Sequence, residues 1–463
     1  MADTGDNPPA YSDVKIPREL VQFLRHETYS LLIKGRTGTG KTTLALSILK
    51  ELNINKNCLY ISTRVSPEQL IQYHPWVENF AQTKRADGQA PGTGKINEIF
   101  VDARLDEPGS LFERITNELM DVKAPTIIID TWDAIGSLMD RESLINNAKV
   151  LQTWRERARA KLVFVTEVPE DHTLDFLVDG IVELRHRHFN ERLIREIFLS
   201  KLRGIRITKS LYTFSLNAGF FHSYEHYQPS VFFNLEYFFN PRHLDKTLLK
   251  DDRFSTGYHE LDEILGGGFP RGGTVSLELG PQVNAKIAIA LLGKIVLKFI
   301  SNKNKVLVQP FEKASMPYLA SLKDNMIIAT TSVKKSIQNK AKYQRKPQDV
   351  ETDIVRIRKR NQRTMLLTIL SGESLMPMQA EDQIKTDLEL FSRIRSSSDL
   401  TVIISRRAAE NKHTFVSELA DIRLNILEVD GTLFLQSESP WSHLYAISVE
   451  PDKEHGIHID PLV

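Results

Sequence analysis

The sequence predicts an α/β protein of two tandem domains, each built on a central, mostly parallel sheet. Three observations point to this fold class. The chain has 463 residues, more than one hydrophobic core usually organises. Short apolar runs alternate with helical segments in the first half, which is typical of a parallel sheet covered on both faces. The same order returns in the second half, which indicates an internal duplication.

The first half opens with the order strand, loop, helix, strand. Residues 29–33 (YSLLI) have the continuous apolar character of a buried strand, and residues 44–52 (LALSILKEL) have helical apolar spacing. Further apolar runs predict strands at residues 58–63 (CLYIST), 126–130 (TIIID) and 161–167 (KLVFVTE).

Cap and edge signals complete the first half. Ser66 followed by Pro67 predicts a helix start, because serine suits the cap and proline suits the first helical position. The alternating segments 180–186, 195–204 and 211–219 predict antiparallel strands at the edge of the sheet.

The second half restarts this outline after an aromatic stretch at residues 227–249, where we place the domain junction. We therefore predict domains at residues 1–235 and 236–463, the second with a basic insertion at about 333–363. We expect the junction aromatics to pack the domains together, with ligand stacking as the alternative. The repeated pattern has a glycine-rich segment at residues 255–273, a helical segment at 281–300, and apolar runs at 274–280, 305–312, 364–370 and 400–406.

Composition and charge exclude several classes of protein. The net charge is +1, from 60 basic and 59 acidic residues, so no overall attraction to nucleic acid or anionic membrane is expected. Cys58 is the only cysteine, which excludes an internal disulfide framework and a cysteine-based zinc site. The first 13 residues are polar, and no run approaches the roughly 20 apolar residues of a membrane span. We expect a cytoplasmic protein without a signal peptide or a membrane partner.

The segment after the first strand has the GxxxxGK(S/T) spacing of a Walker A phosphate loop. Glycines let backbone N–H groups surround a phosphate, and the helix that follows adds its positive end. We expect Lys41 to neutralise the β- and γ-phosphates of ATP and the Thr42 hydroxyl to coordinate Mg²⁺. The predicted ATP-binding residues of this loop are Gly35, Arg36, Thr37, Gly38, Thr39, Gly40, Lys41, Thr42 and Thr43.

Asp130 ends an apolar strand, where a Walker B carboxylate belongs. We expect it to hold the magnesium shell with Thr42, directly or through water. The alternative is that Asp130 ends the strand only because aspartate suits turns. Asp133 is a second candidate for the same shell.

These motifs resemble those of the KaiC and RadA branch of the RecA-like ATPases, and most closely the archaeal gas-vesicle regulators of the GvpD type. Residues 255–273 are similar to the segment before the Walker loop of KaiC-like domains, and Asp179-Gly180 followed by Lys201-Leu-Arg203-Gly resembles the DG and KxRG motifs of that branch. The resemblance covers most of the chain and implies two RecA-like P-loop domains in an ATP-dependent homo-oligomer. It also implies that Lys201 and Arg203 contact phosphate bound to a neighbouring subunit; the alternative is a turn with solvated basic residues.

The chain departs from this resemblance where hydrolysis is concerned. KaiC-like domains carry a pair of glutamates after the second strand, but residues 62–67 read STRVSP. A general base must accept a proton from the nucleophile, and Arg64 cannot. We expect either slow hydrolysis or a substitute, Glu167, at the end of the fourth strand. The predicted catalytic residues are then Lys41, Asp130 and Glu167, unless Glu167 is an ordinary carboxylate at a strand end.

The second half departs further. Its Walker position, residues 280–287, reads GPQVNAKI, so Ala285 replaces the last glycine and Ile287 cannot ligate magnesium. The strand at 364–370 has no acidic residue at its end, although Glu312 falls where a family glutamate would stand. We predict a degenerate RecA-like domain that supports assembly or partner binding.

Two stretches are locally basic, at residues 185–206 and 334–363. We expect the second to be a mobile insertion or a long exposed helix. Such a run can bind phosphate backbones non-specifically or an acidic protein, or it can be merely solvated. No helix-turn-helix or zinc-finger spacing accompanies it. Because GvpD-type regulators have arginine-rich regions and act through a transcription activator, we favour a protein partner, a transcription regulator, over nucleic acid.

The favoured hypothesis is an ATP-binding regulatory switch of low ATPase activity that acts on a protein partner. The alternative from another class is a DNA-stimulated recombination or repair ATPase like RadA. A kinase that uses the same P-loop is a third hypothesis, to which the degenerate second half lends little support.

Overall fold

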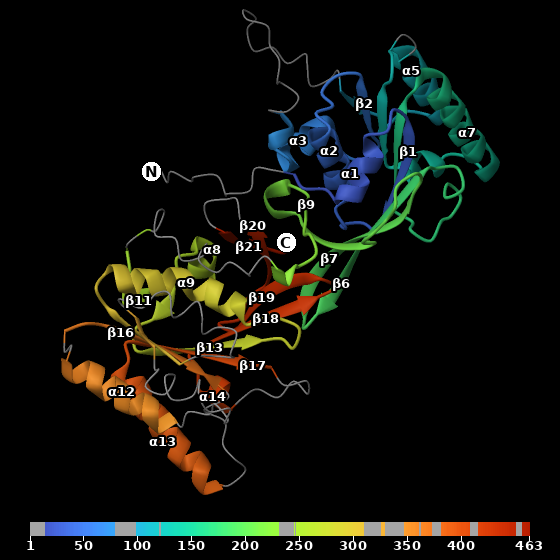
Figure 1. The fold of residues 1–463 in the computed structure, drawn as a ribbon. Coiled ribbons are helices and arrows are strands. Elements are labelled where there is room, and N and C mark those ends of the chain that lie inside the picture. Colours follow the sequence, from blue (N-terminus) through green and yellow to red (C-terminus); the bar gives the residue numbers. More distant parts are fainter. Residues whose placement is uncertain are drawn as a thin grey trace, which may run out of the picture. The chain divides into compact units, whose positions relative to one another are not determined.

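The structure is a computed structural model that describes residues 14–78, 99–119, 122–230, 245, 247–309, 326–328, 347–360, 363–372, 381–407, 415–450 and 456–463. The chain divides between Glu225 and His226 into two compact units, and Leu462–Val463 belong to the first (Figure 1). Among the described residues, no helix combines the length and the apolar character that crossing a bilayer requires.

A nine-stranded sheet organises the first unit, in the order β3-β2-β4-β5-β1-β6-β7-β8-β9. Along this order, every pair of neighbours from β3 through β1 to β6 is parallel. The remaining pairs, from β6 to β9, are antiparallel. The predicted antiparallel edge is therefore confirmed, although its first strand also pairs in parallel with β1. The strands are β1 (Tyr29–Gly35), β2 (Cys58–Ser62), β3 (Phe100–Asp102), β4 (Thr126–Asp130), β5 (Lys161–Thr166), β6 (Gly180–Phe189), β7 (Arg192–Leu202), β8 (Leu211–Ser215) and β9 (His222–Ser223).

Helices cover both faces of this sheet (Figure 1). Side chains alternate along β1, so that Leu31 packs in the core beneath α1 and α2 while Leu32 packs in the core beneath α5 and α7. The Ser66 cap is confirmed: its side chain and that of Gln69 form a reciprocal capping box, with Pro67 at the first helical position. The helices are α1 (Arg18–Leu24), α2 (Lys41–Glu51), α3 (Pro67–Tyr73), α5 (Pro108–Leu119), α6 (Trp132–Gly136) and α7 (Arg141–Ala158).

The second unit repeats the same strand order in its own nine-stranded sheet, β15-β14-β16-β17-β13-β18-β19-β20-β21. Each strand takes the position of its counterpart in the first sheet, so β13 corresponds to β1 and β16 to β4. This match confirms two α/β domains with mostly parallel sheets. The strands are β13 (Gly273–Leu279), β14 (Lys305–Val308), β15 (Met326–Ile328), β16 (Leu366–Ser371), β17 (Leu400–Arg406), β18 (Ile422–Val429), β19 (Thr432–Ser439), β20 (Leu444–Glu450) and β21 (Gly456–Pro461).

The helices of the second unit again form two layers, with α8 and α9 on one face of the sheet and α12 and α13 on the other (Figure 1). A separate three-stranded sheet contains β10 (Leu249–Lys250), β11 (Arg253–Phe254) and β12 (Phe269–Pro270). The helices are α8 (His259–Ile264), α9 (Lys286–Ser301), α12 (Pro347–Arg360), α13 (Glu381–Ser397) and α14 (Phe415–Glu418).

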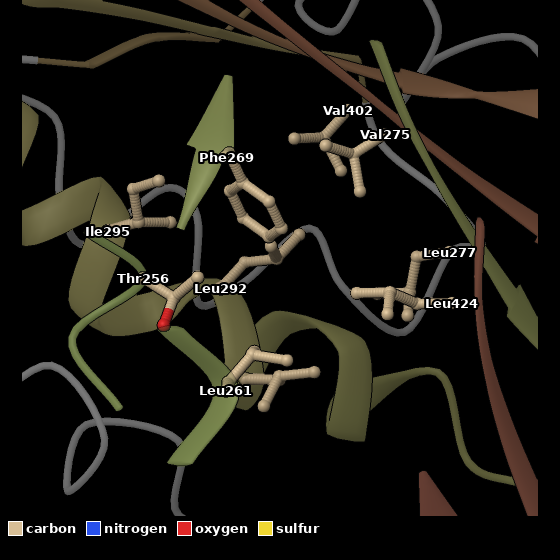
Figure 2. A pocket seen from close by; sticks show the side chains of 10 residues that line it. Thr256, Leu261, Phe269, Val275, Leu277, Leu292, Ile295, Val402 and Leu424 are labelled. Carbon is tan, nitrogen blue, oxygen red and sulfur yellow. The ribbon is translucent and has the colours of Figure 1, made fainter. Parts of the chain in front are cut away.

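A small cavity lies within the core of the second unit (Figure 2). Leucine, isoleucine, valine and phenylalanine side chains line it, and Thr256 is the one lining residue with a polar side chain. Figure 2 shows Leu292 and Phe269 close to its centre, with Val275 and Val402 from the sheet on one side. An apolar cavity of this kind offers no anchor for phosphate.

The second basic segment differs from expectation. Its residues 347–360 form α12, and Val350, Ile354 and Ile357 on one face of this helix are buried against the sheet and α13. Arg358 lies on the covered side as well, where it donates to Asp399 at 2.7 Å. The helix is therefore half-buried rather than fully exposed, because its few apolar residues recur at helical spacing. Residues 334–346 lie outside the described residues.

Candidate functional site: a phosphate loop at the carboxyl edge of the first sheet

The loop between β1 and α2 has the backbone of a phosphate cradle. Gly38 and Gly40 have φ values of +80° and +98°, which residues with a side chain rarely adopt. A Cβ on Gly40 would also come within 2.8 Å of Leu216 Cδ1. Arg36, Thr37 and Gly38 are exposed, so the loop faces solvent at the N-terminus of an 11-residue helix. This arrangement gives N–H groups and positive helix potential to an anion.

Lys41 points into this loop rather than into solvent. It is only 5% exposed, and its Nζ donates to the carbonyl oxygen of Arg36 at 2.9 Å. The Thr39 hydroxyl donates to the same oxygen at 2.7 Å. Burial lowers the pKa of Lys41 from its usual 10.5, while Glu167 and Asp130 oppose that effect. Thr43 is also buried, within α2.

Asp130 and Thr42, which the sequence predicts as magnesium ligands, are in direct contact, and their role as ligands stays a prediction. The Thr42 hydroxyl donates to Asp130 Oδ2 at 2.8 Å, and the Tyr60 hydroxyl donates to the same oxygen at 2.7 Å. Burial raises the pKa of Asp130, although the hydrogen bonds from Tyr60 and Thr42 and the charge of Lys41 act against it. A threonine hydroxyl beside a strand-end aspartate, directly below a phosphate loop, is the oxygen donor set that suits Mg²⁺ on a nucleotide.

The raised pKa of Asp130 leads to a prediction about stability. A folded-state pKa above the unfolded value means that the carboxyl favours folding at low pH and loses that contribution as the pH rises through its folded pKa. At neutral pH the buried charge therefore opposes folding. We expect Asp130→Asn to raise the free energy of unfolding of the nucleotide-free protein by about 1 kcal/mol, since the amide oxygen still accepts from Thr42 and Tyr60.

Urea denaturation at pH 7 measures this change, and Mg²⁺ dependence of ATP binding is measured on the same variant. The amide is a poor magnesium ligand, so we expect the Mg²⁺ dependence to fall as stability rises. Asp102→Asn, at an exposed strand end, serves as the control. A destabilised Asp130→Asn protein would show that the carboxylate is a structural group.

Glu167 joins the site, and both carboxylate oxygens of Asp133 accept hydrogen bonds from the end of β5, so a role of Asp133 as a magnesium ligand stays a prediction. Glu167 Oε1 lies 3.9 Å from Lys41 Nζ, and Oε2 forms a close ion pair with Arg64. Asp133 instead accepts a hydrogen bond from the Thr166 hydroxyl at 2.7 Å and another from the backbone N–H of Glu167. Asp133 thus fixes the end of β5 and the position of Glu167.

Lys201 and Arg203 lie at the opposite end of the strands from the phosphate loop. Lys201 Nζ donates to the carbonyl oxygens of Asp175 and Val178 at 3.1 and 2.6 Å, and Arg203 Nη1 donates to Asp179 Oδ1 at 2.8 Å. Asp179 precedes β6, whose first residue pairs with Leu31, while the phosphate loop follows the far end of β1. About 13 Å of strand separates the two ends. The chain therefore does not bring these residues to its own phosphate loop, and a role toward a neighbouring subunit stays a prediction.

Two residues at the site were not predicted from sequence. Tyr60 supplies a hydroxyl to Asp130 from the neighbouring strand β2. Arg195, which the sequence shows only as part of a basic stretch, donates from β7 to the carbonyl oxygen of Gly38 at 2.9 Å. No local pattern marks either residue, because each contact depends on strand order.

The corresponding turn of the second unit differs in backbone and chemistry. Ala285 precedes α9 with φ −55° and ψ −26°, not with the positive φ of Gly40. The Arg406 guanidinium donates to the carbonyl oxygens of Gly280, at 3.0 Å, and Val283, so this turn already holds a cation. Ile287, at the position of Thr42, is fully buried. The position of Glu312 lies outside the described residues.

Comparisons with known proteins agree with this site. Residues 20–200 match the family model described as "GvpD gas vesicle protein, P-loop domain". The chain is 30% identical over 323 residues to Protein GvpD1 of Halobacterium salinarum. This alignment covers 65% of the present chain and 57% of GvpD1. The chain is also 30% identical to Protein GvpD2 of the same organism over 320 residues. This alignment covers 66% of the present chain and 64% of GvpD2. The chain is 25% identical over 264 residues to the circadian clock oscillator protein KaiC of Thermostichus vulcanus. This alignment covers 51% of the present chain and 45% of KaiC.

The resemblance to RecA-like P-loop proteins near GvpD and KaiC is thereby confirmed. The chain spans 57% to 64% of the length of the two GvpD relatives. The match to the P-loop domain model lies within the first unit, and a P-loop of that kind implies nucleotide binding.

Proposed function

We propose that the chain is a nucleotide-operated regulatory protein, which binds Mg-ATP at the first unit, turns it over slowly, and presents a different surface to a protein partner in each nucleotide state. The observation that carries this proposal is the juxtaposition of Lys41, Thr42 and Asp130 beneath a loop with two left-handed glycines. The similarity to GvpD proteins supports a regulatory role, and we take the partner to be a transcription regulator.

Each residue of the candidate site would have its own part in nucleotide binding. Backbone N–H groups of the loop would surround the phosphates, and Lys41 would move from the Arg36 carbonyl to the β- and γ-phosphate oxygens. Thr42 and Asp130 would hold Mg²⁺, which neutralises charge on the triphosphate. Glu167, whose backbone N–H donates to Asp133, would orient a water molecule.

Slow turnover follows from the chemistry at the end of β2. Arg64 stands where the resemblance places a glutamate, so no carboxylate directly follows β2 to act as a general base. Loss of a well-placed base costs about 10²- to 10⁴-fold in rate. Against a typical enzyme turnover of about 10 s⁻¹, we therefore expect a turnover between about 0.001 and about 0.1 s⁻¹.

The experiment is to measure the size of the purified chain by light scattering with no nucleotide, Mg-ADP and Mg-ATP, and phosphate release in the same samples. We expect saturable ATP binding, a change in size or in hydrogen exchange that distinguishes ATP from ADP, and release near the rate given above. A change in size would also support the proposed homo-oligomer. Absence of ATP binding, or identical behaviour with ATP and ADP, would reject the switch.

A second candidate is a DNA-stimulated ATPase of the RadA kind. The observation in its favour is the exposed basic side of α12, where Arg356, Lys359 and Arg360 face away from the core. Adding single- and double-stranded DNA to the phosphate-release assay separates the two functions. Stimulation of more than about 10-fold, lost between 50 and 200 mM salt, would favour the DNA-dependent enzyme.

A further inference from the structure

Three charged side chains, those of Lys41, Arg64 and Glu167, form a cluster beside the phosphate loop. Glu167, with a 16% exposed side chain, lies between Lys41 and Arg64, whose side chains are 5% and 49% exposed. The contact to Lys41 is 3.9 Å, whereas that to Arg64 is a close ion pair. Arg64 also contributes to the electrostatic environment of both Lys41 and Asp130. One carboxylate thus serves two cations in the nucleotide-free chain.

Strand order explains why these side chains meet. The sheet runs β2-β4-β5-β1, and parallel strands end at the same edge, so Arg64 after β2, Asp130 at the end of β4, Glu167 after β5 and the loop after β1 lie in one row.

The backbone on both sides of the cluster is anchored. Thr63 is fixed by a hydrogen bond from the backbone N–H of Thr131 to its Oγ1 at 2.7 Å, and Ser66 caps α3. Glu167 is fixed through its N–H by Asp133. The Arg64 side chain, half-exposed between two fixed points, is the part of the cluster that is free to reorient.

We propose that Arg64 reads the γ-phosphate of ATP within its own chain by exchanging its partner, from Glu167 to the γ-phosphate. This inference rests on the proposed ATP binding and names the residue that separates ATP from ADP. A guanidinium has five donors in a planar fork and stays charged, which suits a terminal phosphate with three free oxygens. The terminal phosphate of ADP would be held by Lys41 and the loop N–H groups, and Arg64 would keep Glu167 as its partner when ADP is bound.

The exchange couples recognition to Glu167. With ATP bound, Glu167 loses its strong cationic partner and becomes available to orient water; with ADP bound, the ion pair re-forms. The position where the resemblance to KaiC-like domains places a glutamate thus becomes a sensor of the triphosphate. The nucleotide state is then read at the start of α3, three residues beyond Arg64.

The test compares dissociation constants of Mg-ATP and Mg-ADP by calorimetry for the unmodified chain, Arg64→Ala and Glu167→Gln. We expect Arg64→Ala to weaken ATP binding about 10-fold or more while ADP binding changes less than about 3-fold, because a charge-assisted fork to phosphate is lost for ATP alone. We expect Glu167→Gln to tighten ATP binding severalfold, since a competing anion is removed. Arg104→Ala, which breaks an exposed arginine–carboxylate pair after β3, is the matched control and should leave both constants unchanged.

The outcomes separate this inference from the proposed function. If the unmodified chain binds neither nucleotide, the proposed function itself fails. If it binds ATP but Arg64→Ala weakens ATP and ADP equally, or neither, ATP binding stands and the role of Arg64 is overturned. Thermal melting of each variant confirms folding, which the half-exposed position of Arg64 should preserve.

Discussion

Lys41→Ala is expected to weaken Mg-ATP binding by about 30-fold or more, whereas Lys286→Ala leaves it within about 2-fold of the unmodified chain. Lys41 is 5% exposed and aimed into a loop of left-handed glycines, so its ammonium group meets phosphate in a partly desolvated place. Removing one partner of such a charged contact costs about 2–5 kcal/mol, or roughly 30- to several-thousand-fold in affinity. Calorimetric titration with Mg-ATP measures both variants.

Lys286 is a matched control because it occupies the corresponding position at the start of α9 and is 9% exposed. Its turn lacks a left-handed residue, has a buried isoleucine at the metal-ligating position, and contains the Arg406 guanidinium. Equal losses of affinity in the two variants would contradict a single functional loop. A loss in Lys286→Ala alone would move the nucleotide site to the second unit.

The contacts that could be predicted from sequence are those whose partners are close along the chain or fixed by a motif. The phosphate loop needs only one strand, one loop and one helix, and the Ser66 capping box spans four residues. Asp130 was predicted because an apolar run that ends in an acid marks the carboxyl edge of a parallel sheet. The duplicated strand order was also predictable as a class, because both halves repeat the same alternation of strands and helices.

The contacts that could not be predicted depend on which strands become neighbours. Arg64 and Glu167 are far apart in sequence, and only the order β2-β4-β5 places them together. Asp133 follows Asp130 closely in sequence, but its hydrogen bonds to Thr166 and Glu167 depend on β5 lying beside β4. Charge also masked the buried face of α12, since three apolar residues among many ionic ones suffice to pack a helix.

Asp179→Ala is expected to destabilise the first unit by about 3 kcal/mol, the largest stability effect that we predict outside the apolar cores. The carboxylate accepts hydrogen bonds from the backbone N–H and hydroxyl of the fully buried Ser30 at 3.1 and 2.9 Å, and it forms a close ion pair with Arg155. The Arg155 and Asp179 side chains are each 14% exposed. Without Asp179, the largely buried Arg155 guanidinium keeps a 3.5 Å contact to the exposed Glu156 in place of its close partner, and the buried Ser30 hydroxyl loses its acceptor, which is costly.

Urea denaturation followed by tryptophan fluorescence measures the effect in a Trp441→Phe background, because the other three tryptophans, Trp76, Trp132 and Trp154, all belong to the first unit. Arg203→Ala is the control: its side chain is 69% exposed, so loss of its ion pair with Asp179 should cost less than about 1 kcal/mol. A comparable loss in both variants would mean that the KxRG turn, rather than the Asp179–Arg155 pair, holds the amino edge of the sheet.

The pH dependence provides an independent test of the same contacts. Burial raises the pKa of Asp179, but the Ser30 hydrogen bonds and the charges of Arg155 and Arg203 outweigh burial, so the pKa lies below its usual 3.8. A depressed pKa gives stability that is present above the unfolded-state value and is lost as the pH falls through the folded-state value. The difference in unfolding free energy between Asp179→Ala and the unmodified chain should therefore be constant near neutrality and shrink below about pH 4. A difference that persists unchanged in acid would show that Asp179 acts through packing and not through its charge.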